Sequence, residues 1–455
     1  MKNSNRNTKS SKKSVEKVSK GFIWSYALSG GGGIMMIQAT VASYFSIFMT
    51  DTFGIPLKIL SIIVFVGSLL DAINTLIIGN IADYTKTRWG RYRPYFIIPP
   101  VLLTIVSYFL FLAPKGLSPN QKVIYCVVFY ITFQMFTTIC TMPQMAILPA
   151  FIKSSEGRNK VVIWGTIAIS VAFTIATSFY NQLANIFGGL QNLMLVYGVL
   201  TIIPFWSLFK FSKEKYLISL GNRSVFTDIK AILKRKELFK IIIVWIMAAL
   251  GYGVMFSASV YYILYNLARP DLVSSYMLTL SMGATLSMII AMPICLKIFK
   301  TAHKTLIYTQ FIAIICYTVL FFLGKNITLL YLLSFVAAFF ASMQMGLINM
   351  LLNDAIDFIM VKDYLSLNGT LSAIKSFSFK LGGAIGNTMI LQILALTGYI
   401  AGAVGHQPEI TLVGINAMRF MTPVISALVI IICLIKYPIE KYYPEIEEMK
   451  VNFNL

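Results

Sequence analysis

The chain alternates between long apolar runs and short polar segments. Windows of about 20 mostly apolar residues recur about twelve times, and a helix of that length spans the hydrocarbon core of a bilayer. The pattern therefore predicts an all-α membrane protein with twelve transmembrane helices. The expected helices cover about 21–47, 57–82, 95–113, 122–149, 161–187, 190–210, 239–266, 272–296, 305–323, 327–352, 366–397 and 411–435.

The longest polar interruption lies near the middle of the chain. It contains S-K-E-K-Y, G-N-R-S and K-A-I-L-K-R-K, and it separates six apolar windows from six. Two six-helix halves are typical of the major facilitator fold, in which the halves rock about a site at the bilayer midplane. No repeated filter-like loop of a channel is visible. The predicted organisation is a basic tail (1–20), an N-terminal six-helix bundle (21–210), a central loop (211–238), a C-terminal six-helix bundle (239–436) and a second tail (437–455).

Composition and charge support a membrane location and predict an orientation. Hydrophobic residues make up 57% of the chain and charged residues 12%, whereas soluble domains carry about 25% charged residues. Of the 38 Lys and Arg, 30 fall in the two tails and the even-numbered loops, so both termini are expected in the cytoplasm. The richness in Lys, Asn and Ile fits a bacterial plasma membrane. The outer side is assigned Lys58, Lys115, Lys122, Arg269, Lys325 and Arg419.

Several other classes of protein are disfavoured. The net charge of +21 does not indicate nucleic-acid binding, because the basic residues punctuate apolar runs and form no basic, aromatic-interleaved surface. The five cysteines lie inside apolar windows without metal-ligand spacing. No cofactor motif, lipidation signal, cleavable signal peptide or nucleophile-base set is apparent. We expect a monomer without cofactor or metal that contacts membrane lipids and a small-molecule substrate, and not an enzyme.

Few ionisable groups lie deep in the predicted helices. The second helix carries Asp71, and the eleventh carries Lys375 and Lys380. A charge of either sign is costly in hydrocarbon unless it meets a partner. We therefore predict a pair between Asp71 and Lys380 that closes a central cavity on one side of the transport cycle. The alternative is that Lys380 reaches toward the cytoplasmic interface while Asp71 caps a local backbone group.

The second helix runs into a cationic loop, G-N-I-A-D-Y-T-K-T-R-W-G-R-Y-R-P. We expect Gly79 to permit close approach of a neighbouring helix, and Pro94 to start the next helix. The tenth helix is expected to end at N-D-A-I-D-F, whose carboxylates would reach the cytoplasm. A purely structural staple is the alternative to a gate. The candidate cytoplasmic gate comprises Asp83, Arg88, Arg91, Arg93, Asp354 and Asp357.

Uncharged polar and aromatic side chains are candidates for binding a sugar, because its hydroxyls need donors and acceptors while its C–H face stacks on aromatic rings. Packing or an interfacial position is the alternative for each aromatic residue. The first helix also contains Gly30 to Gly33, which predicts either a local break beside the substrate or close helix packing. The candidate substrate residues so far are Thr137, Thr141, Gln144, Trp164, Gln344 and Lys375.

Motifs spread over nearly the whole chain resemble the glycoside-pentoside-hexuronide:cation symporter family. They are T-D-T-F-G-I-P, D-A-I-N with the cationic loop, M-P-Q-M-A-I-L-P, N-D-A-I-D-F and F-K-L-G-G-A-I-G. The resemblance implies a twelve-helix major facilitator fold and sugar uptake driven by Na⁺, H⁺ or Li⁺. It also implies that Asp71 is the first of two carboxylates of the cation site, with Lys380 as the lysine near that site.

The chain departs from the family pattern at positions that bind cation and sugar. Thr75 stands where the family has the second carboxylate. Met35 and Thr141 stand near the two sugar-binding acids, and Thr166 near a helix 5 arginine, which adds Thr166 to the substrate candidates. The inner R-x-E-G motif becomes S-L-N-G at 366–369.

These departures refine the expected function. One carboxylate beside a lysine is a poor site for a hard cation, which prefers several oxygen ligands. We therefore expect a symporter that takes up a neutral sugar or glycoside by alternating access, coupled to H⁺ rather than Na⁺, with Na⁺ or facilitated diffusion as the alternatives. The other functional alternatives are a transporter of another organic solute or a lysolipid, and a non-transporting sensor derived from a carrier.

Overall fold

The computed structural model describes residues 18–152, 155–214, 235–363, 368–437, 439–446 and 448. Within this part, twelve helices are long and apolar enough to cross a membrane, which confirms the expected fold class. The elements of the first six are α1 (Lys20–Gly31), α2 (Gly33–Ile47), η1 (Phe48–Thr52), α3 (Leu57–Tyr84), η2 (Arg93–Phe96), α4 (Pro99–Leu110), α5 (Pro119–Phe151), α6 (Ser155–Ser178), α7 (Tyr180–Ile186) and α8 (Leu190–Phe211).

The second six helices follow the central segment. Several of them are assembled from two or three consecutive pieces, including π-helical turns. The elements are α10 (Lys236–Tyr261), η3 (Tyr262–Asn266), η4 (Pro270–Leu272), α11 (Val273–Leu286), η5 (Ser287–Ala291), α12 (Met292–Phe299), α13 (Ala302–Leu323), α14 (Ile327–Ala341), α15 (Gln344–Asp363), α16 (Asn368–Leu396), α17 (Glu409–Ile435) and η6 (Glu440–Tyr442).

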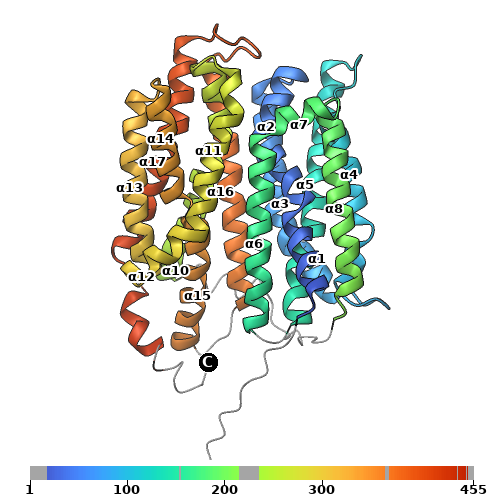
Figure 1. Ribbon diagram of the computed structural model, residues 1–455, viewed down its shortest axis with the longest axis vertical. Coiled ribbons are helices and arrows are strands. Elements are labelled where there is room, and N and C mark those ends of the chain that lie inside the picture. The colour runs from blue at the N-terminus through green and yellow to red at the C-terminus, as the bar shows by residue number, and fades with distance from the viewer. Residues whose placement is uncertain are drawn as a thin grey trace, which may run out of the picture.

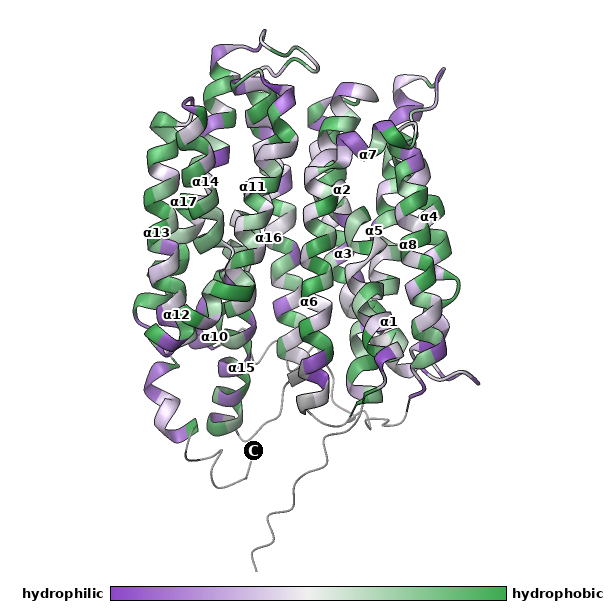
Figure 2. Ribbon diagram, viewed as in Figure 1, coloured by the Kyte–Doolittle hydropathy of each residue, from purple (hydrophilic) through white to green (hydrophobic). Residues whose placement is uncertain are grey.

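The helices form two bundles that stand side by side, α1 to α8 in one and α10 to α17 in the other (Figure 1). We call these the N-half and the C-half. Hydrophobic residues extend along the helices, and hydrophilic residues are frequent toward their ends (Figure 2). Large apolar side chains such as Ile62 and Phe322 are 63% and 74% exposed, as expected where a helix faces acyl chains.

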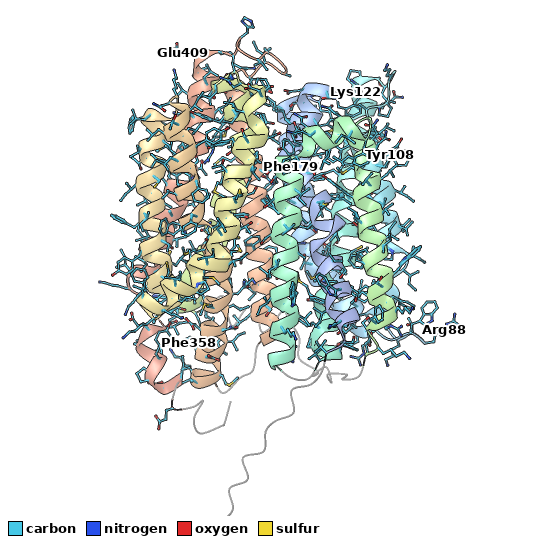
Figure 3. All side chains as sticks on the ribbon, in the orientation of Figure 1. Arg88, Tyr108, Lys122, Phe179, Phe358 and Glu409 are labelled. Atoms are coloured by element: carbon cyan, nitrogen blue, oxygen red, sulfur yellow. The ribbon has the colours of Figure 1, made fainter. Side chains whose placement is uncertain are left out.

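Labelled residues distinguish the two ends of the molecule. Lys122 and Glu409 lie toward one end, and Arg88 and Phe358 toward the other (Figure 3). We call the end with Arg88 the inner end, because the charge bias predicts that it faces the cytoplasm, and the opposite end the outer end.

The glycine run of the first helix lies at a break in that helix and at close contacts with two neighbouring helices. The helix is interrupted at Gly32, between α1 and α2. A methyl group added at Gly31 would overlap the backbone of α6 at Ile169, and one added at Gly33 would overlap the carbonyl oxygen of Tyr197 on α8. The run therefore both breaks the helix and lets two neighbouring backbones approach it.

Two local expectations from the sequence are wrong, and a third is confirmed. Among the described residues, Gly79 has no atom within 4 Å of the position that a methyl group would take, so it serves no close approach. Pro94 does lie in the first turn of the third span, Arg93–Leu110, which opens with the 3₁₀ turn η2 before α4 begins at Pro99. The tenth span does not end at N-D-A-I-D-F, because α15 continues to Asp363.

Arg419, one of the cations assigned to the outer side, lies within α17 and is 0% exposed. Its Nη2 donates to the hydroxyl of Tyr276 over 2.8 Å, and its guanidinium lies 5.6 Å from the ring centre of Tyr317 and 4.9 Å from that of Phe420. The aromatic rings of the C-half interior therefore surround this cation.

Candidate functional site

The expected pair between Asp71 and Lys380 forms in the structure. Lys380 Nζ lies 2.7 Å from Asp71 Oδ2, and it also donates to Thr138 Oγ1 over 3.0 Å and to the carbonyl oxygen of Asp71 over 3.4 Å. The hydroxyl of Thr138 donates to Asp71 Oδ1. Each carboxylate oxygen thus has its own partner, one charged and one neutral.

Three helices meet at this site. Asp71 lies near the middle of α3, Thr138 near the middle of α5, and Lys380 near the middle of α16. Because α3 and α5 belong to the N-half and α16 to the C-half, the ion pair joins the two halves at mid-depth. The sequence pattern did not predict that Thr138 is a partner of Asp71. The only indication was that Thr138 is one of several hydroxyl-bearing residues in the polar stretch of the fourth helix.

Thr75 does not extend the set of ligands around the carboxylate. Its hydroxyl donates to the carbonyl oxygen of Asp71 over 2.9 Å, one helical turn back. A second polar layer lies on the same face of α3, where the hydroxyls of Ser68 and Tyr130 are 3.3 Å apart and Gln134 Nε2 donates to Tyr130 over 3.2 Å. These neutral groups connect α3 to α5 inside the N-half.

Two glutamines proposed to bind substrate hold helices together. Gln144 Nε2 donates to the carbonyl oxygen of Tyr26 over 3.3 Å, which ties α5 to α1. Gln344 Nε2 donates to the carbonyl oxygen of Ala248 over 3.2 Å, which ties α15 to α10. Gln344 is 3% exposed and lies in the interior of the C-half. The structure thus gives Gln344 a packing role away from the interface between the halves.

The remaining substrate candidates differ in exposure. Thr137 is buried, and its hydroxyl has no hydrogen-bond partner among the described residues. Thr141 is half-buried and donates to its own helix, as does the exposed Thr166. Trp164 is 40% exposed, and its ring lies 5.4 Å from that of Trp24, centre to centre. None of their described hydrogen bonds or ring contacts includes Asp71 or Lys380.

Lys375 lies on the same helix as Lys380 but contacts a different element. Its Nζ donates to Asn349 Oδ1 on α15. In the described part of the chain it has no salt bridge, so its partner is neutral. The two lysines of α16 therefore differ: one bridges the halves through a carboxylate, and the other stays within the C-half.

A groove lies between α3 and α16, outward of the ion pair. Its volume is about 310 Å³, and its polar lining comes from Ser61, Thr388 and Gln392. None of the predicted substrate residues lines it. The groove lies along the same two helices that carry Asp71 and Lys380, but neither of these residues lines it.

The cationic loop after α3 is clamped onto the end of α8. Glu214 accepts hydrogen bonds from the backbone amides of Arg91 (2.9 Å) and Tyr92 (2.8 Å). Arg93 donates through Nε and Nη2 to the carbonyl oxygen of Phe209, over 3.0 and 2.6 Å. These contacts agree with the alternative reading of the motif as a structural staple, and they lie entirely in the N-half.

The described contacts of two further gate candidates involve different elements. Arg88 lies over the ring of Trp89 at 4.7 Å. Asp354 accepts from the hydroxyls of Tyr437 (3.3 Å) and Tyr443 (2.8 Å), which belong to the C-terminal segment. Asp357 is half-buried on α15. The side chains of Asp83 and of the S-L-N-G motif at 366–369 lie outside the described part.

Comparison with known proteins defines the class. The model of the family described as MFS/sugar transport protein matches residues 26–441, and the chain belongs to this family. It is a multi-pass membrane transporter of the major facilitator superfamily and not an enzyme.

Individual relatives are symporters of the glycoside-pentoside-hexuronide type, which agrees with the motifs. The chain is 25% identical to the isoprimeverose transporter of Lactiplantibacillus pentosus over 420 residues, covering 89% of this chain and 86% of the relative. It is also 25% identical to the inner membrane symporter YicJ of Escherichia coli (strain K12), covering 90% and 89%.

Solved structures support the fold. A bacterial homologue of the human lysosomal transporter Spinster, in an inward-facing and unoccupied conformation, superposes with a TM-score of 0.68 at 14% identity, covering 94% of this chain and 99% of that one. The nucleoside transporter NupG gives a TM-score of 0.64 at 12% identity, with coverage of 92% and 100%.

Proposed function

We propose that this chain takes up a sugar or glycoside together with a proton by alternating access, and that Asp71 is the group that binds the proton. The observation that carries the proposal is the contact of 2.7 Å between Asp71 Oδ2 and Lys380 Nζ. This contact joins the N-half to the C-half, so the charge of one side chain is linked to the relative position of the halves.

The surroundings of Asp71 favour a proton over Na⁺. Its two carboxylate oxygens are engaged by the Lys380 ammonium and the Thr138 hydroxyl. A sodium ion would have to displace or approach that ammonium, and Thr75 supplies a hydroxyl already bonded to the helix backbone where a second carboxylate would help. A proton needs only one oxygen and no coordination shell.

Proton binding would loosen the link between the halves. A neutral carboxyl group loses most of its Coulomb attraction to Lys380, and the ammonium becomes free to hydrogen-bond a substrate oxygen. Substrate and proton would then favour the same rearrangement, which is the requirement for coupled transport. This mechanism uses the ion pair as the switch and needs no metal site.

The substrate assignment rests on the family and on uncharged polar groups. Relatives of this chain include an isoprimeverose transporter and a raffinose carrier protein. Thr137, Thr141 and Thr166 offer hydroxyl groups that suit neutral sugar hydroxyls. A neutral sugar or glycoside is therefore the proposed substrate class.

The test measures transport in proteoliposomes with an imposed proton or sodium gradient and a panel of labelled sugars, glycosides and lysolipids. We expect the proton gradient to drive accumulation of a sugar. Asp71→Asn should abolish this accumulation while retaining counterflow exchange, which requires no ion gradient. Thr75→Val, which removes a hydroxyl without removing charge, is the matched control and should retain accumulation.

Three results would contradict the proposal. Sugar accumulation driven by a Na⁺ gradient alone would reject the proton as the coupling ion. Full accumulation by the Asp71→Asn variant would reject Asp71 as the proton-binding residue. Transport of lysolipids but of no sugar would reject a sugar or glycoside as the substrate.

A further inference from the structure

A second polar cluster joins the two halves at the outer end. Asp51 accepts a hydrogen bond from the Tyr399 hydroxyl at both carboxylate oxygens, over 2.8 Å at Oδ1 and 3.0 Å at Oδ2. The hydroxyl of Tyr265 also donates to Oδ2, and the Tyr399 and Tyr265 hydroxyls are 2.7 Å apart. Thr50 Oγ1 donates to Oδ1 over 2.7 Å.

The carboxylate and the tyrosines belong to opposite halves. Asp51 lies in η1, at the outer end of the first helix, and the segment after it is held on α5 because Lys122 Nζ donates to the carbonyl oxygen of Phe53 over 2.8 Å. Tyr265 lies in η3, and Tyr399 follows α16. Apart from the adjacent Thr50, the described partners of Asp51 all come from the C-half.

This division has a physical consequence. A carboxylate only accepts hydrogen bonds, and it needs donors wherever water is partly excluded. Asp51 is half-buried, and among the described residues it forms no salt bridge. The two tyrosines therefore supply the donors, and they can do so only while the outer end is closed. When the halves separate, water must replace both hydroxyls.

The other polar contacts between the halves at this end are neutral. Thr177 and Ser281 have their hydroxyl oxygens 2.9 Å apart, and Ser274 donates to Gln182 Oε1 over 3.0 Å. Such bonds exchange readily with water and contribute little each. Among the described contacts between the two halves at the outer end, those to Asp51 are the charge-assisted ones, and bonds of this kind are roughly twice as strong as neutral ones.

We propose that Asp51, Tyr265 and Tyr399 form an outer latch that holds the transporter closed on the outer side and sets the balance between outward-open and outward-closed forms. The latch gives a function to the T-D-T-F-G-I-P motif, which the ion pair of Asp71 does not involve. It depends on the alternating access of the family and is independent of the substrate and the coupling ion.

The test measures the opening of the outer end directly. Spin labels are attached at K115C and K325C, because Lys115 and Lys325 are exposed in outer turns of the N-half and the C-half. The five native cysteines are first replaced by serine. Double electron–electron resonance in lipid nanodiscs, without substrate or ion gradient, then measures the distance between the two labels. Short distances report the outward-closed form and long distances the outward-open form.

Asp51→Asn should raise the ratio of long to short distances by about 10-fold or more, because a hydrogen bond to a charged group changes an equilibrium constant by roughly 10-fold to 100-fold. Tyr265→Phe and Tyr399→Phe should shift it in the same direction by less. In the Asp51→Asn background, the tyrosine substitutions should add little further shift, since the shared acceptor is already weakened.

Matched controls come from the outer end of the C-half. Asp271→Asn removes a carboxylate whose salt bridge of 2.7 Å, to Arg269, lies within its own half. Tyr331→Phe removes a hydroxyl that contacts Ser275 of the same half. Both controls should keep the distance distribution of the parent. A difference between latch and control variants therefore reports on closure and not on general loss of a polar group.

The outcomes decide the proposal. An unchanged distribution in Asp51→Asn, or equal shifts in Asp51→Asn and Asp271→Asn, would overturn it. If Asp51→Asn does not yield folded protein, Tyr399→Phe carries the test alone, and an unchanged distribution there would overturn the latch. Because no gradient or substrate is present, failure of proton coupling at Asp71 would leave this result unaffected.

Discussion

The pair between Asp71 and Lys380 gives a stability prediction that can be worked out from the structure. Removing one partner of a buried ion pair costs about 3–5 kcal/mol, because the remaining charge stays buried without compensation. The side chain of Lys380 is 26% exposed and that of Asp71 12%, so water hydrates part of the remaining charge. We therefore expect Asp71→Asn or Lys380→Met to cost about 2–3 kcal/mol.

The double variant Asp71→Asn with Lys380→Met should behave differently from the sum of its parts. It leaves no charge at the site, and a methionine fills much of the volume of the lysine stem. Its stability should lie within about 1 kcal/mol of the parent, since a neutral replacement of a buried pair is often nearly neutral in stability. The expected coupling between the two substitutions is thus about 3–7 kcal/mol in favour of the double variant.

The assay is thermal unfolding of the purified protein in detergent. For a domain of 150–250 residues, 1 kcal/mol shifts the melting temperature by roughly 2–4 °C, so each single variant should melt about 4–12 °C lower. Lys375→Met is the control, because this lysine lies on the same helix and has the neutral partner Asn349; it should shift the midpoint less. A double variant whose loss equals the sum of both singles would refute the reasoning.

Further predictions concern packing and the inner loop. Gly33→Ala should destabilise the protein by about 3 kcal/mol or more, because the added methyl group would overlap the carbonyl oxygen of Tyr197. Gly79→Ala is the control and should be tolerated, because the space around Gly79 is open. The melting temperatures of the two variants test this prediction, and equal decreases would contradict the packing described for Gly33. Glu214→Ala should leave two backbone amides of the loop after α3 without their acceptor and cost about 1–3 kcal/mol. Faster proteolysis of this loop would reveal the change, and Glu445→Ala, at an exposed position, is the control that should keep the parental rate.

Much of the fold could be predicted because hydropathy is a property of local sequence. The lipid core requires long apolar helices, so the twelve spans and the division into six and six follow from the pattern of residues. The pairing of Asp71 with Lys380 could also be anticipated, since few charges lie at depth and opposite charges there need one another.

Other features depended on contacts between distant helices. Nothing in the local sequence indicates that Thr138 donates to Asp71, that Tyr265 and Tyr399 meet Asp51, or that Arg419 lies among aromatic rings. Such contacts depend on the rotation and crossing of helices that are far apart in the chain, and many side-chain combinations satisfy the same apolar pattern.

The sequence by itself therefore determined the membrane-spanning architecture and the scarcity of charges within it. The tertiary structure decided which neutral groups surround each charge, and which of those groups belong to the opposite half. The physical reason is that burial in lipid restricts each helix separately, whereas a hydrogen bond requires two particular side chains to meet within about 3 Å.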